Sequence, residues 1–283
     1  MKRLIHDIQI LVMLALLVTG LQSCSDVLQD AGKVQVSFTA TLPTDAHTRA
    51  FGEAEKINTL VVGVFTKKFD AVDASSWIYH EMERKAFSVS GTSANVQLEL
   101  VMDQTYSFVF WAYHNSQDVY DLTDLTAIKM ETPSGPMTLD KAEGMDAFFA
   151  TMDITITGAG SHPVELVRPL AQVNVGTTGK SMQVSFTAKA APDTFYPFTK
   201  TVSGATDFTW SYDGTETATF SADGKQFNYL AMGYLFAPAL TAAKIDCELT
   251  LTEGANSQQI GFSQVEIEAN KRSNIAGNFT PTE

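Results

Sequence analysis

Apolar and polar residues alternate with a period of two along most of the chain from Lys33 onward, and helical periodicity is nearly absent. The first clear case places Val34, Val36 and Phe38 between polar neighbours, and turn-forming Gly, Pro, Asp and Asn residues separate such segments. Further segments of this kind contain Val96–Leu100, Tyr106–Phe110, Ile154–Ile156, Val173–Val175, Val184–Phe186, Cys247–Leu251 and Val265–Ile267. The pattern predicts half-buried strands and an all-β fold of antiparallel β-sandwiches.

The length of the chain favours two such sandwiches in tandem. About 260 residues follow a short leader, which is enough for two domains of roughly 100–150 residues each. The stretch Gly158–Pro163 is rich in glycine, ends in proline and divides the chain nearly in half. We therefore expect domains at 50–160 and 161–283, preceded by a separate segment at 24–49. The hexapeptide Gln35–Ala40 recurs as Gln183–Ala188, but β-rich sequences often reuse such words, so it carries little weight.

Two kinds of connection are expected between the strands. The longest irregular region, from Glu131 to Gly144, is predicted to be a surface loop of the first domain. Asp213-Gly214 and Asp223-Gly224 predict tight turns in the second.

The first 24 residues have the features of a bacterial lipoprotein signal. Lys2 and Arg3 are basic, an apolar run extends from Ile8 to Gly20, and Ser23 directly precedes Cys24. The run is too short to cross a bilayer comfortably. We expect cleavage of residues 1–23 and lipidation of Cys24, although an ordinary secretory leader would share most of these features.

The charge and the cysteine count limit the possible functions. Removing Lys2, Arg3 and Asp7 with the leader changes the formal charge from −13 to −14, which disfavours binding to nucleic acid. If Cys24 is acylated, Cys247 has no partner for a disulfide, and its strand context predicts a small core residue.

No constellation for catalysis is visible, so an enzyme is a poor third hypothesis and no cofactor is expected. Phosphate loops, dinucleotide fingerprints and nucleophile elbows are absent. The candidate acid pairs, Asp121 with Asp124 and Glu266 with Glu268, suit solvated positions better than a glycosidase site. Asp70 with Asp73 lacks a calcium-loop pattern, and His47, His80, His114 and His162 are too scattered for a metal site.

Three tryptophans offer a different kind of site. Trp77, Trp111 and Trp210 are candidates for a platform that stacks on sugar rings. Trp111 lies in an apolar run and is more simply interpreted as a core residue.

Four stretches, in order along the whole chain, resemble the fimbrillin family, the lipoprotein subunits of type V pili. The main one is Arg168-Pro169-Leu170-Ala171-Gln172-Val173-Asn174-Val175. The others are Val36–Ala50, Tyr234–Pro238 and Asn270–Phe279.

The resemblance implies transthyretin-like β-sandwiches, no catalytic activity, and assembly by strand exchange with other fimbrial subunits at the outer membrane and cell surface. In such pilins an arginine-specific protease removes the first strand, and the matching position here is Arg49, before Ala50. The surrounding segment Pro43–Gly52 is polar, as expected of a loop that proteases enter.

The strand that would be displaced carries Val34, Val36, Phe38, Ala40 and Leu42. If these side chains face inward, their burial contributes on the order of 10 kcal/mol, so an emptied groove would require a replacement strand.

The candidate donor strand is short, with Ile275, Gly277 and Phe279 before Pro281. This departs from the longer extension of stalk pilins and leaves a stalk, anchor, tip or minor subunit open. The alternative function is a surface lipoprotein that does not polymerise and binds a glycan or a host protein.

Overall fold

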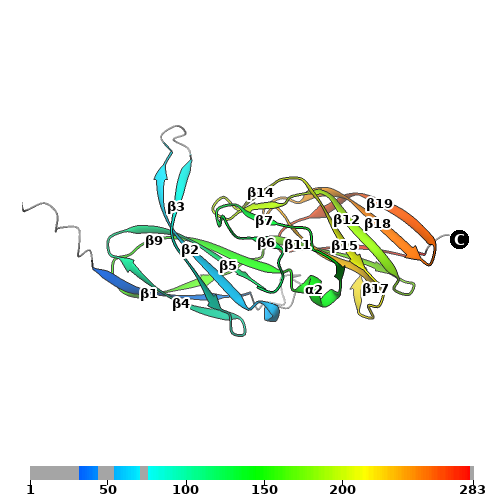
Figure 1. Cartoon of the computed structure of the whole chain (residues 1–283), viewed down its shortest axis with the longest axis horizontal. Helices are drawn as coiled ribbons and strands as arrows, with labels where there is room; N and C mark the ends of the chain where they lie inside the picture. The colour runs from blue at the N-terminus through cyan, green and yellow to red at the C-terminus, as the bar shows by residue number, and fades with distance from the viewer. Residues whose placement is uncertain (1–31, 44–53, 71–75, 281–283) are drawn as a thin grey trace, which may run out of the picture.

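The computed structural model describes residues 32–43, 54–70 and 76–280, which form two β-sandwiches arranged end to end (Figure 1). The prediction of an all-β fold is confirmed. The described chain begins at one end of the long axis and finishes at the other. None of the described helices is long and apolar enough to span a membrane.

The first sandwich consists of a three-stranded and a four-stranded sheet. Their strand orders are β10-β1-β4 and β3-β2-β5-β9. The strands are β1 (Lys33–Thr41), β2 (Thr59–Phe69), β3 (Trp77–Ser88), β4 (Ser93–Val101), β5 (Thr105–Tyr113), β9 (Ala147–Thr155) and β10 (Gly160–Glu165). A short 3-10 helix, η1 (Ala54–Lys56), precedes β2.

The second sandwich repeats this connectivity strand by strand. Its sheets have the orders β16-β17-β11-β20 and β19-β18-β12-β15-β8. The strands are β8 (Pro136–Met137), β11 (Leu170–Thr177), β12 (Gln183–Ala191), β15 (Thr206–Tyr212), β16 (Thr219–Ala222), β17 (Lys225–Phe236), β18 (Ala243–Glu253), β19 (Asn256–Ile267) and β20 (Arg272–Gly277). β11 lies between parallel β20 and antiparallel β17, as β1 lies between β10 and β4. β12 lies between β15 and β18, as β2 lies between β3 and β5.

This correspondence bears on two features of the sequence. β10 begins at Gly160, at the expected domain boundary, and pairs with β1 of the first sandwich as far as Glu165. The repeated hexapeptides lie in β1 and β12, whereas the structural equivalent of β1 is β11. The shared hexapeptide therefore reflects the alternating pattern of strands and not the duplication of the sandwich.

The predicted surface loop at Glu131–Gly144 is partly a packed element. Met137 in β8 pairs with Tyr212 of β15, and helix α2 (Leu139–Glu143) follows, with Thr138 as its N-cap. Leu139 and Ala142 are buried. The prediction was wrong because these apolar residues pack against the other sandwich, a contact that local sequence does not reveal.

The tight turn predicted at Asp223-Gly224 is confirmed, whereas Asp213-Gly214 lies in a longer connection between β15 and β16. Asp223 and Gly224 have φ angles of 50° and 73°, as a tight two-residue hairpin between β16 and β17 requires. Gly214 has φ 81°, and a Cβ atom there would lie 2.3 Å from the backbone of Met182.

A fifth sheet joins the two sandwiches. It has the order β14-β13-β7-β6, in which β6 (Tyr120–Asp121) and β7 (Ile128–Met130) precede β8, and β13 (Thr194–Tyr196) and β14 (Thr201–Ser203) follow β12. β2 and β5 are apolar without interruption because both of their faces are covered. Leu60 and Phe108 face the core of the first sandwich, and Val61 and Val109 face the joining sheet.

A buried ion pair lies at the junction. Arg168 donates from Nε and Nη2 to the two oxygens of Asp146, at 2.7 and 2.6 Å, and both side chains are at most 4% exposed. Arg168 also donates from Nη1 to Asn270 and lies over the Phe148 ring. Burial raises the pKa of the Asp146 carboxyl, and the Arg168 charge opposes that shift.

We expect Asp146→Ala to lower the free energy of unfolding by about 3–5 kcal/mol, because Arg168 would stay buried without its counter-charge. Urea denaturation measures this. Glu253→Ala is the matched control, since its pair with Lys180 is solvent-exposed and should contribute less than about 1 kcal/mol. Equal losses in the two variants would contradict the prediction.

Candidate functional site

β1 is the central strand of its sheet and is seated on both sides. It pairs with β4 from Lys33 to Thr41 and with β10 from Val36 to Thr41. Val36, Phe38, Ala40 and Leu42 are at most 3% exposed, and Val34 is half-buried. These side chains therefore face inward, into the core of the first sandwich.

Phe38 is the main apolar contact of β1. Its ring lies 4.9 Å from that of Phe108, 5.5 Å from Phe110 and 5.6 Å from His162, measured between centroids. At the C-terminal end of β1, Leu42 N donates to Thr92 O, and Thr41 O accepts from Leu166 N. The strand is thus bound by a hydrogen-bond ladder on each side and by an aromatic cluster beneath.

The residues predicted to be modified or cut lie outside the described part of the chain. These are Cys24, Arg49 and Ala50. Arg49 belongs to the connection between Pro43, after β1, and Ala54, before β2. Its cleavage stays a prediction.

The candidate donor residues lie on their own sandwich. Ile275 is buried in β20, which pairs in parallel with β11, and Gly277 ends that strand. Phe279 is half-buried, contacts Phe262 edge to face, and exchanges hydrogen bonds with Thr177. Serving as donor to another molecule would require this segment to leave β11.

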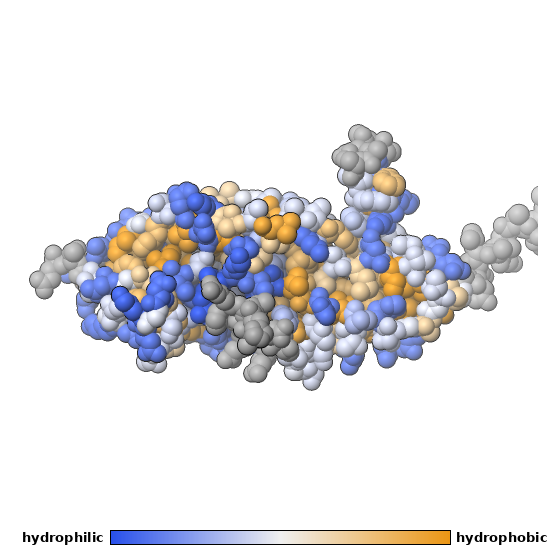
Figure 2. All heavy atoms as spheres, turned by 180° about the vertical axis from the view of Figure 1, so that it is seen from behind, coloured by the Kyte–Doolittle hydropathy of each residue, from blue (hydrophilic) through white to orange (hydrophobic). Residues whose placement is uncertain are grey.

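The three tryptophans do not form one platform. Trp111 and Trp210 are fully buried, which contradicts a shared sugar-stacking surface and confirms the core interpretation of Trp111. Trp77 alone is exposed, at 40%, and it stacks on Phe69, which is 63% exposed. Both lie on the β2–β3 hairpin, which projects from the body (Figure 2).

We define the arm as residues 66–69 of β2 and 77–80 of β3. β2 pairs with β5 only as far as Phe65, so the arm is a two-stranded ribbon. Its base is fixed by Phe198, from the β13–β14 connection, which stacks on Tyr79 at 3.7 Å and meets Phe65 edge to face.

The candidate acid pairs occupy solvated or structural positions. Asp121 and Asp124 accept hydrogen bonds from Thr123 and Thr126 in turns, and the Thr123 bonds lower the pKa of Asp121. Glu266 is exposed, and Glu268 pairs with Lys271. Among the described residues, no group of three or more His, Cys, Asp or Glu side chains is arranged to hold a metal ion.

Cys247 is a core residue, as predicted. It is 3% exposed, and burial, with Asp246 nearby, raises the pKa of its thiol to about 12. A neutral buried thiol is a poor nucleophile.

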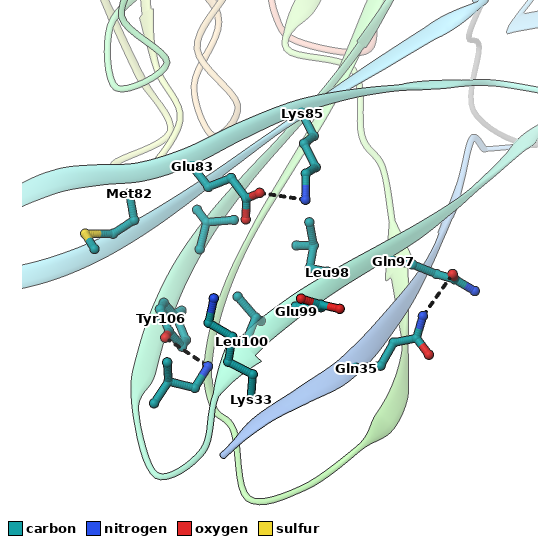
Figure 3. Close-up of a pocket in the computed structure, with 12 residues that line it drawn as sticks. Lys33, Gln35, Met82, Glu83, Lys85, Gln97, Leu98, Glu99, Leu100 and Tyr106 are labelled. Carbon is teal, nitrogen blue, oxygen red and sulfur yellow. Dashed lines mark hydrogen bonds and ion pairs between the residues drawn. The ribbon is translucent and has the colours of Figure 1, made fainter. Parts of the chain in front are cut away.

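A groove opens between the edges of β3 and β4 (Figure 3). Its volume is about 600 Å³. The floor is apolar, formed by Val64, Leu98, Leu100 and Tyr106, and the exposed side chain of Met82 lies at the rim. The remaining lining residues are Lys33, Gln35, Glu83, Lys85, Gln97, Glu99 and Val101.

The polar side chains of the rim are largely paired with one another. Lys85 forms an ion pair with Glu83 at 2.6 Å, and Gln35 donates to Gln97 at 3.1 Å. Val101 N donates to the hydroxyl of Tyr106.

Sequence reasoning did not single out Asp146, Met82 or Phe198. Arg168 was noted only as part of a motif, although an arginine directly before a buried strand gave a signal that a counter-charge was needed. Met82 and Phe198 acquire their roles from neighbours distant in sequence, so no local signal identifies them.

A family model described as a family of unknown function (DUF6562) matches residues 28–282. The chain belongs to this family. No curated protein matches the sequence of this DUF6562 member.

Two solved structures illustrate what this DUF6562 chain is similar to. A fimbrial assembly protein from Parabacteroides distasonis is 13% identical, with a TM-score of 0.48, over 88% of this chain and 92% of that one. The fimbrial anchor protein Mfa2 from Porphyromonas gingivalis is 12% identical, with a TM-score of 0.45, over 77% of this chain and 78% of that one.

We expect Phe38→Ala to lower the free energy of unfolding by about 3–5 kcal/mol, because it leaves a cavity under β1 beside Phe108 and Phe110. Gln35→Ala, on the outer face of the same strand, is the control and should change it by less than about 0.5 kcal/mol. Urea denaturation compares the two. Similar values would show that β1 is not held by its inner face.

Proposed function

We propose that the protein is a subunit, accessory protein or anchor of a type V-like fimbria. It is delivered to the outer membrane by a lipid on Cys24 and serves adhesion at the cell surface, with other fimbrial subunits as partners. Cleavage after Arg49 then licenses its assembly by strand exchange.

The observation that carries the proposal is the position of β1. It is the first strand of the sandwich, it is central in its sheet, and one cut in the 44–53 connection separates it from β2. Release of its buried residues forgoes roughly 5–10 kcal/mol of apolar burial. The same cut would detach the body from Cys24, so lipid release and the opening of the groove would be one event.

The ends of the molecule suit head-to-tail assembly. β1 lies at one end of the long axis and the residues after β20 at the other (Figure 1). During assembly, the segment with Ile275, Gly277 and Phe279 leaves β11 and occupies the groove that β1 has vacated in a neighbouring molecule. Backbone hydrogen bonds there give affinity, and side-chain pockets set the register.

We expect treatment of the purified lipoprotein with an arginine-specific protease to produce a new terminus at Ala50 and SDS-resistant ladders. Terminal sequencing and unboiled gels measure these results. Arg49→Ala is the matched variant and should stay monomeric with its original terminus. Clean cleavage that leaves only monomers would overturn the proposal.

A second experiment addresses the donor. A chain ending at Gly277 keeps the residues of β20 that pair with β11 but loses Phe279. We expect it to be cleaved normally and to form shorter ladders or none; unchanged ladders would exclude the segment after Gly277 as a necessary part of the donor.

The exposed Trp77–Phe69 stack favours one alternative, a glycan-binding surface protein. Aromatic faces suit sugar rings, and the fixed base of the arm holds this pair in place. In this case we expect uncleaved protein to bind a glycan array and Trp77→Ala to lose the signal. Leu240→Ala, which alters a 94% exposed apolar residue outside the arm, should keep it. An array signal unaffected by Trp77→Ala would reject this site.

A further inference from the structure

The second sandwich covers two sheet edges that the first leaves open. β16 lies beside β17, and β8 lies beside β15. The equivalents of β17 and β15 in the first sandwich are β4 and β3, which end their sheets. Within the described residues, no strand pairs with the outer edge of either. The groove of about 600 Å³ lies between these two edges.

We propose that the groove is a docking site for an extended polypeptide strand of another protein, which adds to the outer edge of β4. This site differs from the seat of β1, because β1 stays in place and its Lys33 and Gln35 form part of the groove. The proposal does not depend on cleavage at Arg49.

The edges differ in how well they are protected against strand addition. β3 has a bulge opposite Val64 and Phe65 and a charged run from Glu81 to Lys85, and β10 contains Pro163. Bulges, charges and proline all hinder pairing at an edge. β4 has no proline, and its outward residues Asn95, Gln97 and Glu99 include a single charge. Of these three edges, β4 is therefore the one that accepts a strand most readily.

The chemistry of the groove favours a peptide backbone over a small polar ligand. The rim side chains Glu83 and Lys85 already form an ion pair, and Gln35 already donates to Gln97. The backbone edge of β4 is then the main source of hydrogen bonds, while Met82 at 64% exposure offers apolar surface to cover.

The charge of the molecule selects among polypeptides. The chain carries a formal charge of −13, so long-range electrostatics favour a neutral or basic partner over a second copy. The rim contributes Lys33 and Lys85 against Glu83 and Glu99, which balance locally. The expected partner is a strand with apolar side chains at alternate positions and neutral or basic charge, rather than a second copy.

The test uses the full, uncleaved chain and a labelled synthetic peptide of about eight residues that alternates valine and threonine between terminal lysines. A peptide with proline at its central positions is the control, because it cannot complete the ladder. Fluorescence anisotropy measures affinity, and hydrogen–deuterium exchange locates the site. We expect binding of the first peptide only, with new protection in 93–101.

Met82→Lys should weaken binding of the peptide about tenfold, since it removes apolar contact and repels the lysines of the peptide. The dissociation constant from fluorescence anisotropy measures this change. Leu240→Lys, with the same change of side chain at a distant exposed site, should bind as the unmodified protein does.

Three results would overturn the proposal. They are the absence of binding, protection at β10 or β19 instead of β4, and equal affinity of the Met82→Lys protein. Light scattering adds a fourth, because a dimer that Met82→Lys dissociates would assign the groove to a second copy. Ladder formation after Arg49 cleavage is unaffected by any of these outcomes, so the two proposals fail separately.

Discussion

The ion pair between Asp146 and Arg168 fixes how the two sandwiches meet. Asp146 directly precedes β9 of the first sandwich, and Arg168 lies two residues before the start of β11 in the second. A hydrogen bond from Arg168 to Asn270 also holds the turn that precedes β20 at this junction. Three distant parts of the chain are thus held by one guanidinium, which presents its donors in a rigid fork. A lysine in its place would supply a charge without that geometry.

Around this junction, the duplicated connectivity produces two sandwiches with different surroundings. In the second, β16 covers the edge of β17 and β8 covers the edge of β15, and the core is continuous with the joining sheet. The first has open edges at β3 and β4 and a separate core on its far side. The asymmetry arises because β8, in the connector 114–146, pairs with β15 of the second sandwich, while no described strand of the second half pairs with the outer edge of β3 or β4. The open edges of β3 and β4, the arm and β1 consequently all belong to the first sandwich.

Much of the fold was predictable because alternation is a local property. The strands around Val36, Leu98, Val173 and Leu249 follow from it, and so does the buried face of β1. The segment with Met137 and Leu139 was predicted wrongly because its burial depends on β15 and β17, far along the chain. Trp111 was recognised as a core residue from its apolar run, whereas the sequence did not separate the buried Trp210 from the exposed Trp77. Of the candidate site, the sequence identified β1, whereas the groove needs two edges whose proximity only the fold reveals.

The groove and the seat of β1 share a wall, and this links the two proposed associations. Lys33 and Gln35 line the groove, and Gln35 bonds to Gln97 of β4. Loss of β1 would remove that wall and free the inner edge of β4 as well as the outer one. A strand on the outer edge of β4 therefore requires β1 to be present, whereas a donor strand requires β1 to be gone. Under the two proposals, the first association belongs to the molecule that keeps β1 and the second to the molecule that has lost it, so a single cut between β1 and β2 would exchange one kind of partner for the other.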